Sequence, residues 1–503
     1  MSRFALQNWK HMDYIGVEVE NPPLISYLAQ AKEECSFMPL TSLELLKQHG
    51  NKVKRLREGN LKELNTVKPT NSSGHQALST AGIMKLARAQ LFVLNSQKAD
   101  VLSSVASCIG AQSALGSEFS EDSGLAILLQ AAAENVVNQQ YVYSRKLLNK
   151  CNHFSSKSGY PAQRIVHYFA EALREKIDQE CGMVASLEDL EGETRRPIDE
   201  KLALVSLQPG MMASQQENPF SLVSQFTAIG SIRATVATAR RVHLINFGLD
   251  NGSHWTLIMQ DFAAQYNYPI ELLKITAVGT SKQMMEETVK WLSAFADSIS
   301  LPFTFNIVVS DLKDLKEDMF KLEADEVVAV YLDRRLWTLL AWPNYLEALI
   351  AVISKLKPRV MVVKEMEAST NNPIFLERFH EALIFFSGMF ESIKDCMDNH
   401  IFYRKLTEEV YCRNMIRNII TAEGKERVHR HERVAFWRTL FAKFGFVETA
   451  LSQSSFRRAS MFLKRSALYS SFTIYMDGKC LILGWKRTPF ISVSAWKFQY
   501  DSE

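Results

Sequence analysis

Beyond residue 213 the chain alternates short apolar runs with longer segments in which apolar residues recur at helical spacing. The runs are rich in branched residues and apolar at successive positions, which is typical of parallel strands covered on both faces. Such strands are expected at residues 242–247, 270–276, 303–309, 327–332 and 360–363. Helices are expected at 255–266, 281–299, 345–356, 375–390 and 408–422. This order predicts a doubly wound α/β sheet.

The last part of the chain shows a different pattern. Apolar runs at 472–475, 480–485 and 491–493 follow one another closely, too closely for crossover helices. Such spacing favours antiparallel pairing, with Asp477 and Gly478 as a hairpin turn.

Residues 124–173 carry apolar positions with a period near 3.6, which predicts helices. The stripe is either the buried face of a helical domain or a surface for a partner, although it lacks the sustained heptads of a coiled coil. The most apolar positions of this stripe are candidate partner-binding residues: Leu125, Leu128, Leu129, Val136, Leu147 and Leu148.

The first 123 residues differ from the rest of the chain. Segment 51–68 is rich in charge, and 113–123 is small, acidic and polar, as in connectors. We expect residues 1–123 to form a variable, partly disordered extension with one helix at about 79–94. This extension contains a run of basic residues that is either solvated charge or a nuclear import signal, Lys52, Lys54, Arg55 and Arg57.

Composition limits the classes of function. Among 503 residues, 58 basic side chains face 55 acidic ones, so the net charge of +3 gives no strong field for attracting a phosphate backbone. The seven cysteines form no CxxC pair, which indicates reduced thiols and no structural metal. The N-terminus does not resemble a secretory signal, and no apolar run approaches the roughly 20 residues that span a bilayer. We therefore expect a soluble intracellular protein without sequence-specific DNA binding of its own.

The turn after the first strand, residues 248–255, is where a doubly wound enzyme would bind a nucleotide. Its glycines, Gly248 and Gly252, have GxxxG spacing instead of GxGxxG, and no carboxylate ends the second strand, at 276–280. The sequence therefore favours a connecting turn, with no cofactor and no catalytic residue.

Two further groups invite chemical interpretations. Glu365 and Glu367 could form a carboxylate pair for acid–base catalysis, but a structural ion pair with Lys364 or Arg378 is the simpler expectation.

His429 and His431 flank Arg430 in a charged segment. Since the sequence shows no third metal ligand beside them, a solvated, salt-bridged helix start is favoured over a metal site.

Three stretches resemble motifs of the GRAS family of plant transcriptional regulators, in the family's order. The strand Val242, His243, Leu244, Ile245, Asn246 resembles VHIID. A second set resembles the PFYRE region: Pro373, Arg378, Phe379, Arg427, His431 and Glu432. A third resembles the SAW motif: Trp437, Gly445, Trp485, Ser494, Ala495 and Trp496.

The resemblance covers residues 124–503 and implies a fold and a function. It implies a methyltransferase-like, Rossmann-type sheet (213–503) with an N-terminal helical cap and connector (124–212). It also implies a non-enzymatic nuclear co-regulator that binds transcription factors, often zinc-finger proteins, and pairs with other GRAS proteins. The alternative is an S-adenosylmethionine-dependent methyltransferase or small-molecule receptor that uses the crevice at the first strand.

The chain departs from the family's pattern at several positions. Asn246 replaces the final Asp of VHIID, Phe386 stands for a tyrosine, and His429 stands where Glu is common. The extension lacks the DELLA and TVHYNP sequences, so the resemblance does not extend to the DELLA subgroup.

Overall fold

The computed structural model describes residues 78–110, 121–183, 218–247, 252, 254–264, 269–279, 282–397, 401–464 and 466–499. The candidate import residues Lys52, Lys54, Arg55 and Arg57 lie outside these ranges. Within them, no helix is both long and apolar enough to cross a membrane.

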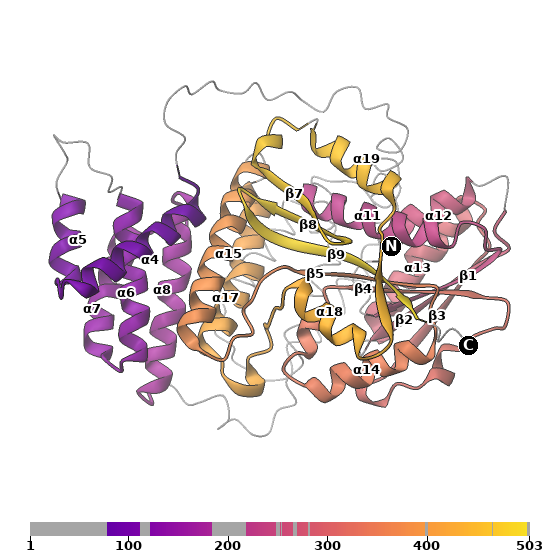
Figure 1. The fold of residues 1–503 in the computed structure, drawn as a ribbon, viewed down its shortest axis with the longest axis horizontal. Coiled ribbons are helices and arrows are strands. Elements are labelled where there is room, and N and C mark those ends of the chain that lie inside the picture. Colours follow the sequence, from indigo (N-terminus) through magenta and orange to yellow (C-terminus); the bar gives the residue numbers. More distant parts are fainter. Residues whose placement is uncertain are drawn as a thin grey trace, which may run out of the picture. The chain divides into compact units, whose positions relative to one another are not determined.

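A nine-stranded mixed sheet forms the centre of the fold, in the order β3-β2-β1-β4-β5-β9-β8-β7, with β6 also paired to β9 (Figure 1). The first five strands are parallel, and β9 runs antiparallel to β5. The parallel strands are β1 Arg241–Phe247, β2 Leu272–Gly279, β3 Phe303–Val309, β4 Val327–Asp333 and β5 Val360–Met366. The remaining strands are β6 Phe446–Thr449, β7 Phe472–Asp477, β8 Cys480–Trp485 and β9 Thr488–Phe498. The predicted doubly wound sheet with antiparallel C-terminal strands is confirmed.

Two details of the antiparallel part differ from expectation. Strand β6 was not predicted, because four residues are too short for a clear alternation pattern. The β7–β8 turn consists of Gly478 and Lys479, since Asp477 is paired with Cys480. Gly478 has φ +59°, a left-handed conformation that glycine adopts without steric cost.

Helices cover both faces of the sheet because neighbouring strand residues point to opposite sides. Leu244 packs in one apolar cluster with Phe220, Trp255 and Phe379, and its neighbour Ile245 packs in another. The first face holds α11 Pro219–Thr235, α12 Trp255–Ala263, α13 Lys282–Ser298 and α15 Phe375–Cys396. The second holds α14 Pro343–Lys355 and α18 Val434–Ala442. Helix α19, Gln453–Lys464, packs on α11.

The region after α15 is less regular than its sequence pattern suggested. The predicted helix at 408–422 consists of a π-helical turn, Thr407–Cys412, and α17, Arg413–Thr421, after the short α16, Ile401–Leu406. Short 3-10 turns occur at Leu312–Asp314, Glu317–Phe320, Leu336–Leu339, Gly424–Glu426 and Tyr469–Ser471.

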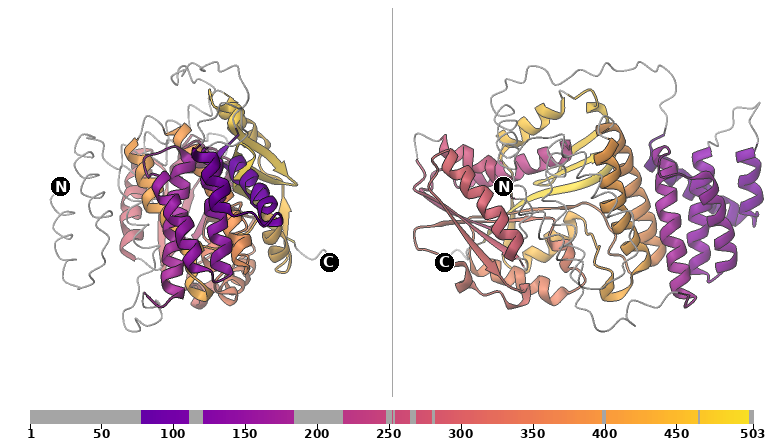
Figure 2. Two further views of the ribbon diagram at one scale, coloured as in Figure 1. Left: turned by 90° about the vertical axis from the view of Figure 1, so that its left-hand side faces the viewer. Right: turned by 180° about the vertical axis from the view of Figure 1, so that it is seen from behind.

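In the described part of the chain five helices form the cap, and Figures 1 and 2 show them grouped beside α15 and α17. They are α4 Thr80–Ser96, α5 Val101–Gly110, α6 Glu121–Val137, α7 Tyr141–Phe154 and α8 Pro161–Glu180. The six candidate partner-binding residues are 0–3 % exposed inside this bundle: Leu125, Leu128, Leu129, Val136, Leu147 and Leu148. Their stripe is the core of the cap, so a partner cannot reach these side chains and that candidate role is corrected.

The interpretation of residues 1–123 as an extension with one helix also changes. Both α4 and α5 pack on α6, and Met84 and Leu91 belong to the apolar cluster of the cap. The described part of that region therefore contributes two helices to the bundle. Local periodicity could indicate the α4 helix but not the surface on which it docks.

The cap is joined to the core chiefly through α8. Phe169 packs edge-on against Phe379 of α15, with ring centroids 5.5 Å apart. Arg164 and Glu408 form an ion pair at 2.9 Å, with both side chains 3 % exposed. Burial raises the pKa of Glu408 to about 7, although the Arg164 charge opposes this shift. Apolar and ionic contacts together fix the cap to the core.

Candidate functional site at the carboxyl edge of the sheet

The strand order reverses between β1 and β4, the place where doubly wound enzymes bind ligands beyond the carboxyl ends of the strands. Here Tyr331 of β4 lies in register with Asn246 of β1. Trp255, at the start of α12, packs against Tyr331 with ring centroids 5.5 Å apart, and His254 lies 5.3 Å from the same ring. The exposed fractions of His254, Trp255 and Tyr331 are 5 %, 0 % and 0 %. Aromatic side chains therefore pack closely together beside the carboxyl ends of β1 and β4.

The glycine in the turn after β1 has a packing role. Gly252 has φ +65°, and a Cβ there would lie 2.5 Å from Thr288 Cγ2 on α13. A side chain would therefore strain the backbone and clash with α13. These contacts agree with the sequence interpretation of a connecting turn. Residues 248–251 and 253 lie outside the described ranges.

Charged groups at the ends of β4 and β5 are engaged with one another. Lys364 Nζ donates to Asp333 Oδ2 at 2.9 Å, and Tyr331 Oη donates to the same oxygen at 3.2 Å. Burial opposes ionisation of Asp333, but the Lys364 and Arg334 charges outweigh it and hold the pKa of Asp333 well below its usual range. Asp333 is therefore an ionised structural partner, unsuited to accept a proton near neutral pH.

Glu365 at the end of β5 and Glu367 just beyond it do not form the expected ion pair. Glu365 Oε1 accepts a hydrogen bond from Leu336 N–H at 2.7 Å, and Glu367 Oε2 accepts one from Val434 N–H at 3.1 Å. Lys364 pairs with Asp333 instead, and Arg378 with Glu423. Burial raises the pKa of Glu365 to about 8, with the Asp333 charge adding to the effect. The two carboxyls anchor different backbone segments, so this geometry does not make them an acid–base pair.

The expectation of a solvated helix start at His429 and His431 is wrong. Both imidazoles are buried, and His429 stacks on Trp337 with ring centroids 4.7 Å apart and planes at 18°. His431 lies 5.1 Å from the same indole. Burial lowers the pKa of His429 to about 4 and that of His431 to about 3, the latter aided by the neighbouring His429. Across the described residues no group of three or more His, Cys, Asp or Glu side chains is arranged to hold a metal ion.

The VHIID-like strand is buried over its whole motif, Val242, His243, Leu244, Ile245 and Asn246. His243 lies near the amino end of β1, the edge opposite the crevice. Its Nδ1 is 3.0 Å from Glu326 Oε2, and its Nε2 is 2.7 Å from Thr276 Oγ1. This histidine therefore belongs to a structural network.

The PFYRE-like residues tie α15 to the segment that follows α17. Arg378 is fully buried and donates to the carbonyls of Ile419 and Pro373, at 3.1 and 3.0 Å, besides pairing with Glu423. The others make core or backbone-linking contacts: Phe379 packs on Phe169, Arg427 donates to Thr370 O, Glu432 accepts from Asn371 and His431 packs on Trp337. The structure thus brings these distant residues together as a framework.

The SAW-like residues pack the C-terminal strands onto the core. Trp437 Nε1 donates to Glu432 O at 3.1 Å, and Trp496 Nε1 donates to Ser494 Oγ at 2.9 Å. Ala495 lies opposite Val362 in the β5–β9 pairing. Two positions complete the set: Trp485 is buried between Phe220 and Phe472, and Gly445 has φ +78°. These contacts match the interpretation of the aromatics as packing residues.

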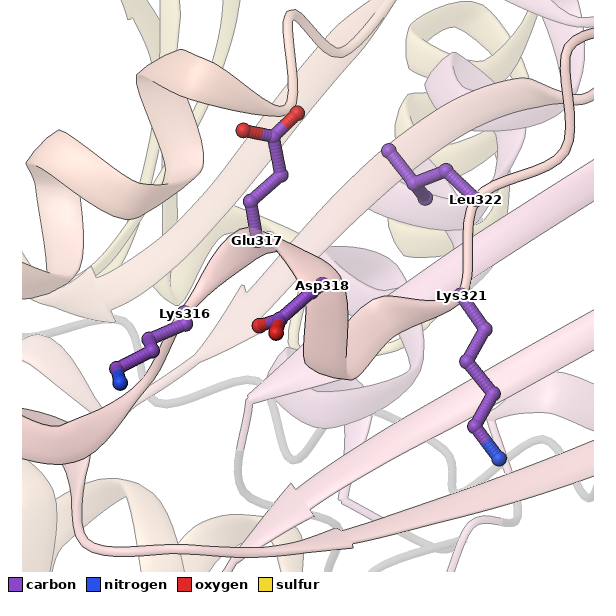
Figure 3. A pocket seen from close by; sticks show the side chains of 5 residues that line it. All are labelled: Lys316, Glu317, Asp318, Lys321 and Leu322. Atoms are coloured by element: carbon purple, nitrogen blue, oxygen red, sulfur yellow. The ribbon is translucent and has the colours of Figure 1, made fainter.

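A separate hollow lies on the surface, lined by Lys316, Glu317, Asp318, Lys321 and Leu322. Its charged side chains point in different directions and do not converge on a common point (Figure 3). The arrangement offers no coherent binding geometry.

Sequence reasoning missed the side chains that pack beside the carboxyl ends of β1 and β4, although the signal was present. His254 and Trp255 follow the glycine turn directly, where a phosphate site requires close approach of the backbone to its ligand. The contribution of Tyr331 depends on strand pairing, which local sequence does not specify.

Comparison with known proteins agrees with this geometry. The chain matches the GRAS domain family over residues 125–497. The DELLA protein GAI1 of Vitis vinifera is 30% identical over 386 residues, 75% of this chain and 62% of that protein. The DELLA protein RGL1 of Arabidopsis thaliana is 29% identical over 383 residues, 75% of this chain and 71% of that protein. The chain thus spans about three fifths of the length of the first of these relatives.

A solved structure shows the same fold. The crystal structure of SCL7 in Oryza sativa superposes with a TM-score of 0.65 and 23% identity, covering 74% of this chain and 99% of that one. The methyltransferase-like sheet and helical cap expected from the motifs are confirmed. Since the family match extends over well more than half of the residues, the chain belongs to the GRAS domain family.

Proposed function

We propose that this GRAS protein is a nuclear transcriptional co-regulator that acts through protein contacts and not through catalysis. The observation that carries the proposal is the aromatic packing of His254, Trp255 and Tyr331 at the strand-order reversal. The carboxylates at the same edge bind backbone amides or a neighbouring lysine. A fold whose ligand position is packed with its own side chains is suited to serve as a scaffold.

The partners proposed are DNA-binding transcription factors, including zinc-finger proteins, and other GRAS proteins in homodimers or heterodimers. The near-neutral net charge of +3 supports recruitment to DNA through such partners over direct sequence-specific binding. Partner contact must use surfaces other than the six buried stripe residues.

Affinity capture tests the proposal. The full chain, immobilised and exposed to nuclear extract from its own tissue, is expected to retain transcription factors and GRAS proteins, identified by mass spectrometry. A matched control is the chain after thermal unfolding, which exposes apolar surface non-specifically. Recovery of the same set by folded and unfolded chain, or of no transcription factor, contradicts the proposal.

Calorimetry separates the enzymatic alternative. Even a micromolar S-adenosylmethionine site would release about 8 kcal/mol of binding free energy and would be readily measured. We expect no saturable heat with this cofactor. Saturable binding, lost when Gly252 is replaced, would favour a methyltransferase or small-molecule receptor.

Nuclear localisation is tested by a separate experiment. Replacing Lys52, Lys54, Arg55 and Arg57 by Gln removes the basic run from the candidate import signal. If this run directs import, a fluorescent fusion of the wild-type chain concentrates in the nucleus and the variant does not. Equal nuclear levels would assign import to another segment, and exclusion of both would contradict nuclear action.

A further inference from the structure

Helix α19 carries the sequence Arg457, Arg458, Ala459, Ser460, Met461 in its middle. Arg457 is exposed, Ser460 is partly exposed, and Met461 is 53 % exposed. The helix holds three basic residues, Arg457, Arg458 and Lys464, and no acidic one. Two arginines three and two positions before a serine, with an apolar residue after it, form the pattern that kinases with acidic substrate grooves recognise through charge pairing.

The groups of this pattern are not engaged elsewhere. Within the described ranges, neither arginine takes part in a hydrogen bond or ion pair, and the Ser460 hydroxyl likewise has no hydrogen bond. Most arginines elsewhere in the fold differ, as in the Arg413–Glu171 and Arg438–Glu448 pairs. Unpaired guanidinium groups retain their full capacity to bind carboxylates of an incoming protein.

Helix α19 is also lightly attached. Its buried residues are Ser455, Ala459 and Leu463, and its packing partner is α11. The closest approach is between small residues, because a Cβ on Gly230 of α11 would lie 2.1 Å from Ser455 Oγ. Ala459 and Leu463 are buried in the apolar core, and Phe456 and Phe462 are partly buried against it. Because α19 buries far fewer side chains than the central helix α15, its local opening costs less free energy than global unfolding, and opening presents Ser460 in the extended form that a kinase binds.

We propose that Ser460 is a phosphorylation site for a basophilic serine/threonine kinase. Ser460 Oγ attacks the γ-phosphorus of ATP, so the new Oγ–P bond forms as the bond between the γ-phosphorus and the β–γ bridging oxygen breaks. The hydroxyl proton passes to the base of the kinase, and ADP leaves. This inference goes beyond the proposed co-regulator function and does not depend on it.

The helix can accommodate the product after it closes again. A phosphate on Ser460 lies one turn from Arg457 (i−3) and from Lys464 (i+4), the spacing at which side chains meet on a helix surface. It adds about 1.5 to 2 negative charges and accepts charge-assisted hydrogen bonds from both cations. The face of α19 thus changes from a net charge of about +3 to about +1 without loss of the helix.

The test uses the folded full chain, ATP and the catalytic subunit of a basophilic kinase such as cAMP-dependent protein kinase. Phosphopeptide mapping is expected to find phosphate on Ser460, and S460A to lose that signal. The R457Q/R458Q variant keeps the acceptor and is expected to be modified at least tenfold more slowly. The S454A variant is the matched control, because Ser454 is an exposed serine on the same helix without preceding arginines.

Two results would overturn the proposal. One is phosphate on Ser460 only after the chain has been heat-unfolded, which would show that α19 protects its acceptor. The other is equal modification of Ser460 in wild type and R457Q/R458Q. Circular dichroism melts of each variant that match the wild type exclude misfolding as the cause of a lost signal.

Discussion

The two edges of the parallel sheet differ in how their buried polar groups are partnered, although the buried Asp333–Lys364 pair at the carboxyl edge is also engaged. At the amino edge, His243, Lys274 and Glu326 form a linked network in which Lys274 Nζ lies 3.1 Å from Glu326 Oε1 and His243 Nδ1 lies 3.0 Å from Oε2. At the carboxyl edge, the Asn246 side chain and both ring nitrogens of His429 have no hydrogen-bond partner among the described residues. Both sets are almost completely buried.

This difference indicates which buried polar groups contribute to the stability of the fold. A linked set of buried charges is costly to break, because removing one member leaves the others desolvated and unpaired. A buried group with no partner contributes no such interaction, so its replacement by an apolar side chain of similar shape costs little. At the carboxyl edge, Asn246 and His429 should therefore be more dispensable than the members of the amino-edge network, whereas the buried Asp333–Lys364 pair should not be.

The largest expected effect lies at the amino edge. Replacing Glu326 by Gln removes the buried countercharge of Lys274 and leaves it only the exposed Glu323 at 3.7 Å, so the free energy of unfolding should fall by about 3 to 5 kcal/mol. Urea denaturation measures this loss. The matched control is Glu323→Gln, because Glu323 is 53 % exposed and its pairs should contribute below about 1 kcal/mol. Equal losses in both variants would remove the distinction between the linked network and ordinary surface pairs.

Sequence patterns anticipated the parallel strands because each buried strand is apolar at successive positions. The run at 327–332 lies within β4, Val327–Asp333, which is buried without a break from Val328 to Asp333. They also favour a connector at the glycine turn, since GxxxG spacing lacks the backbone approach of a phosphate site. Both inferences rest on local sequence, where the physical cause lies within a few residues.

The burial of the segment that contains His429 and His431 could not be predicted from local sequence. Six of the nine residues at 425–433 are charged, which is typical of a solvated surface. In the fold, this segment packs its imidazoles on Trp337, a residue nearly a hundred positions earlier. The same limit applies to α4, whose partner surface on α15 lies about 300 residues away. In both cases burial depends on packing against residues far away in the sequence, so the local pattern of charged residues does not predict it.

A second prediction concerns Glu365, whose raised pKa of about 8 means that the folded state holds a proton that the unfolded chain, with a pKa near 4.5, releases. Stability from this group is therefore complete below about pH 4.5 and is lost as pH rises toward 8. Glu365→Gln removes the titration and keeps an oxygen for Leu336 N–H. At pH 7 the variant should be more stable by up to about 3 kcal/mol, and the gain should vanish near pH 4.5.

Chemical denaturation across pH 4.5 to 8 measures this difference. Glu347→Gln, on the exposed face of α14, is the matched control and should leave the pH dependence unchanged. A Glu365→Gln variant less stable than wild type at pH 8 would show that the Glu365 carboxylate is ionised and stabilised in the fold, which contradicts this prediction.

A third prediction concerns acid. The pKa of His429 is about 4 in the fold and about 6.5 in the unfolded chain, so the unfolded state binds a proton first as pH falls. Stability from the neutral imidazole is present above pH 6.5 and is lost toward pH 4, by about 2 kcal/mol between pH 7 and pH 5. His429→Phe keeps a ring to stack on Trp337 and should reduce this loss by that amount. Thermal melts at pH 7 and pH 5 measure this loss in the wild type and in the variant. An equal loss in both proteins would show that His429 has the same protonation state in the folded and unfolded chain.

The smallest expected effect is the most direct measure of the carboxyl edge. Asn246→Leu replaces an amide that has no hydrogen-bond partner among the described residues, so the free energy of unfolding at pH 7 should change by less than about 1 kcal/mol. The matched comparison is Thr276→Val, which deprives His243 Nε2 of its partner at 2.7 Å and should cost about 1 to 3 kcal/mol. Both changes are of similar size and lie in neighbouring strands. If Asn246→Leu costs as much as Thr276→Val, the carboxyl edge relies on its polar groups as the amino edge does, and the contrast between the two edges fails.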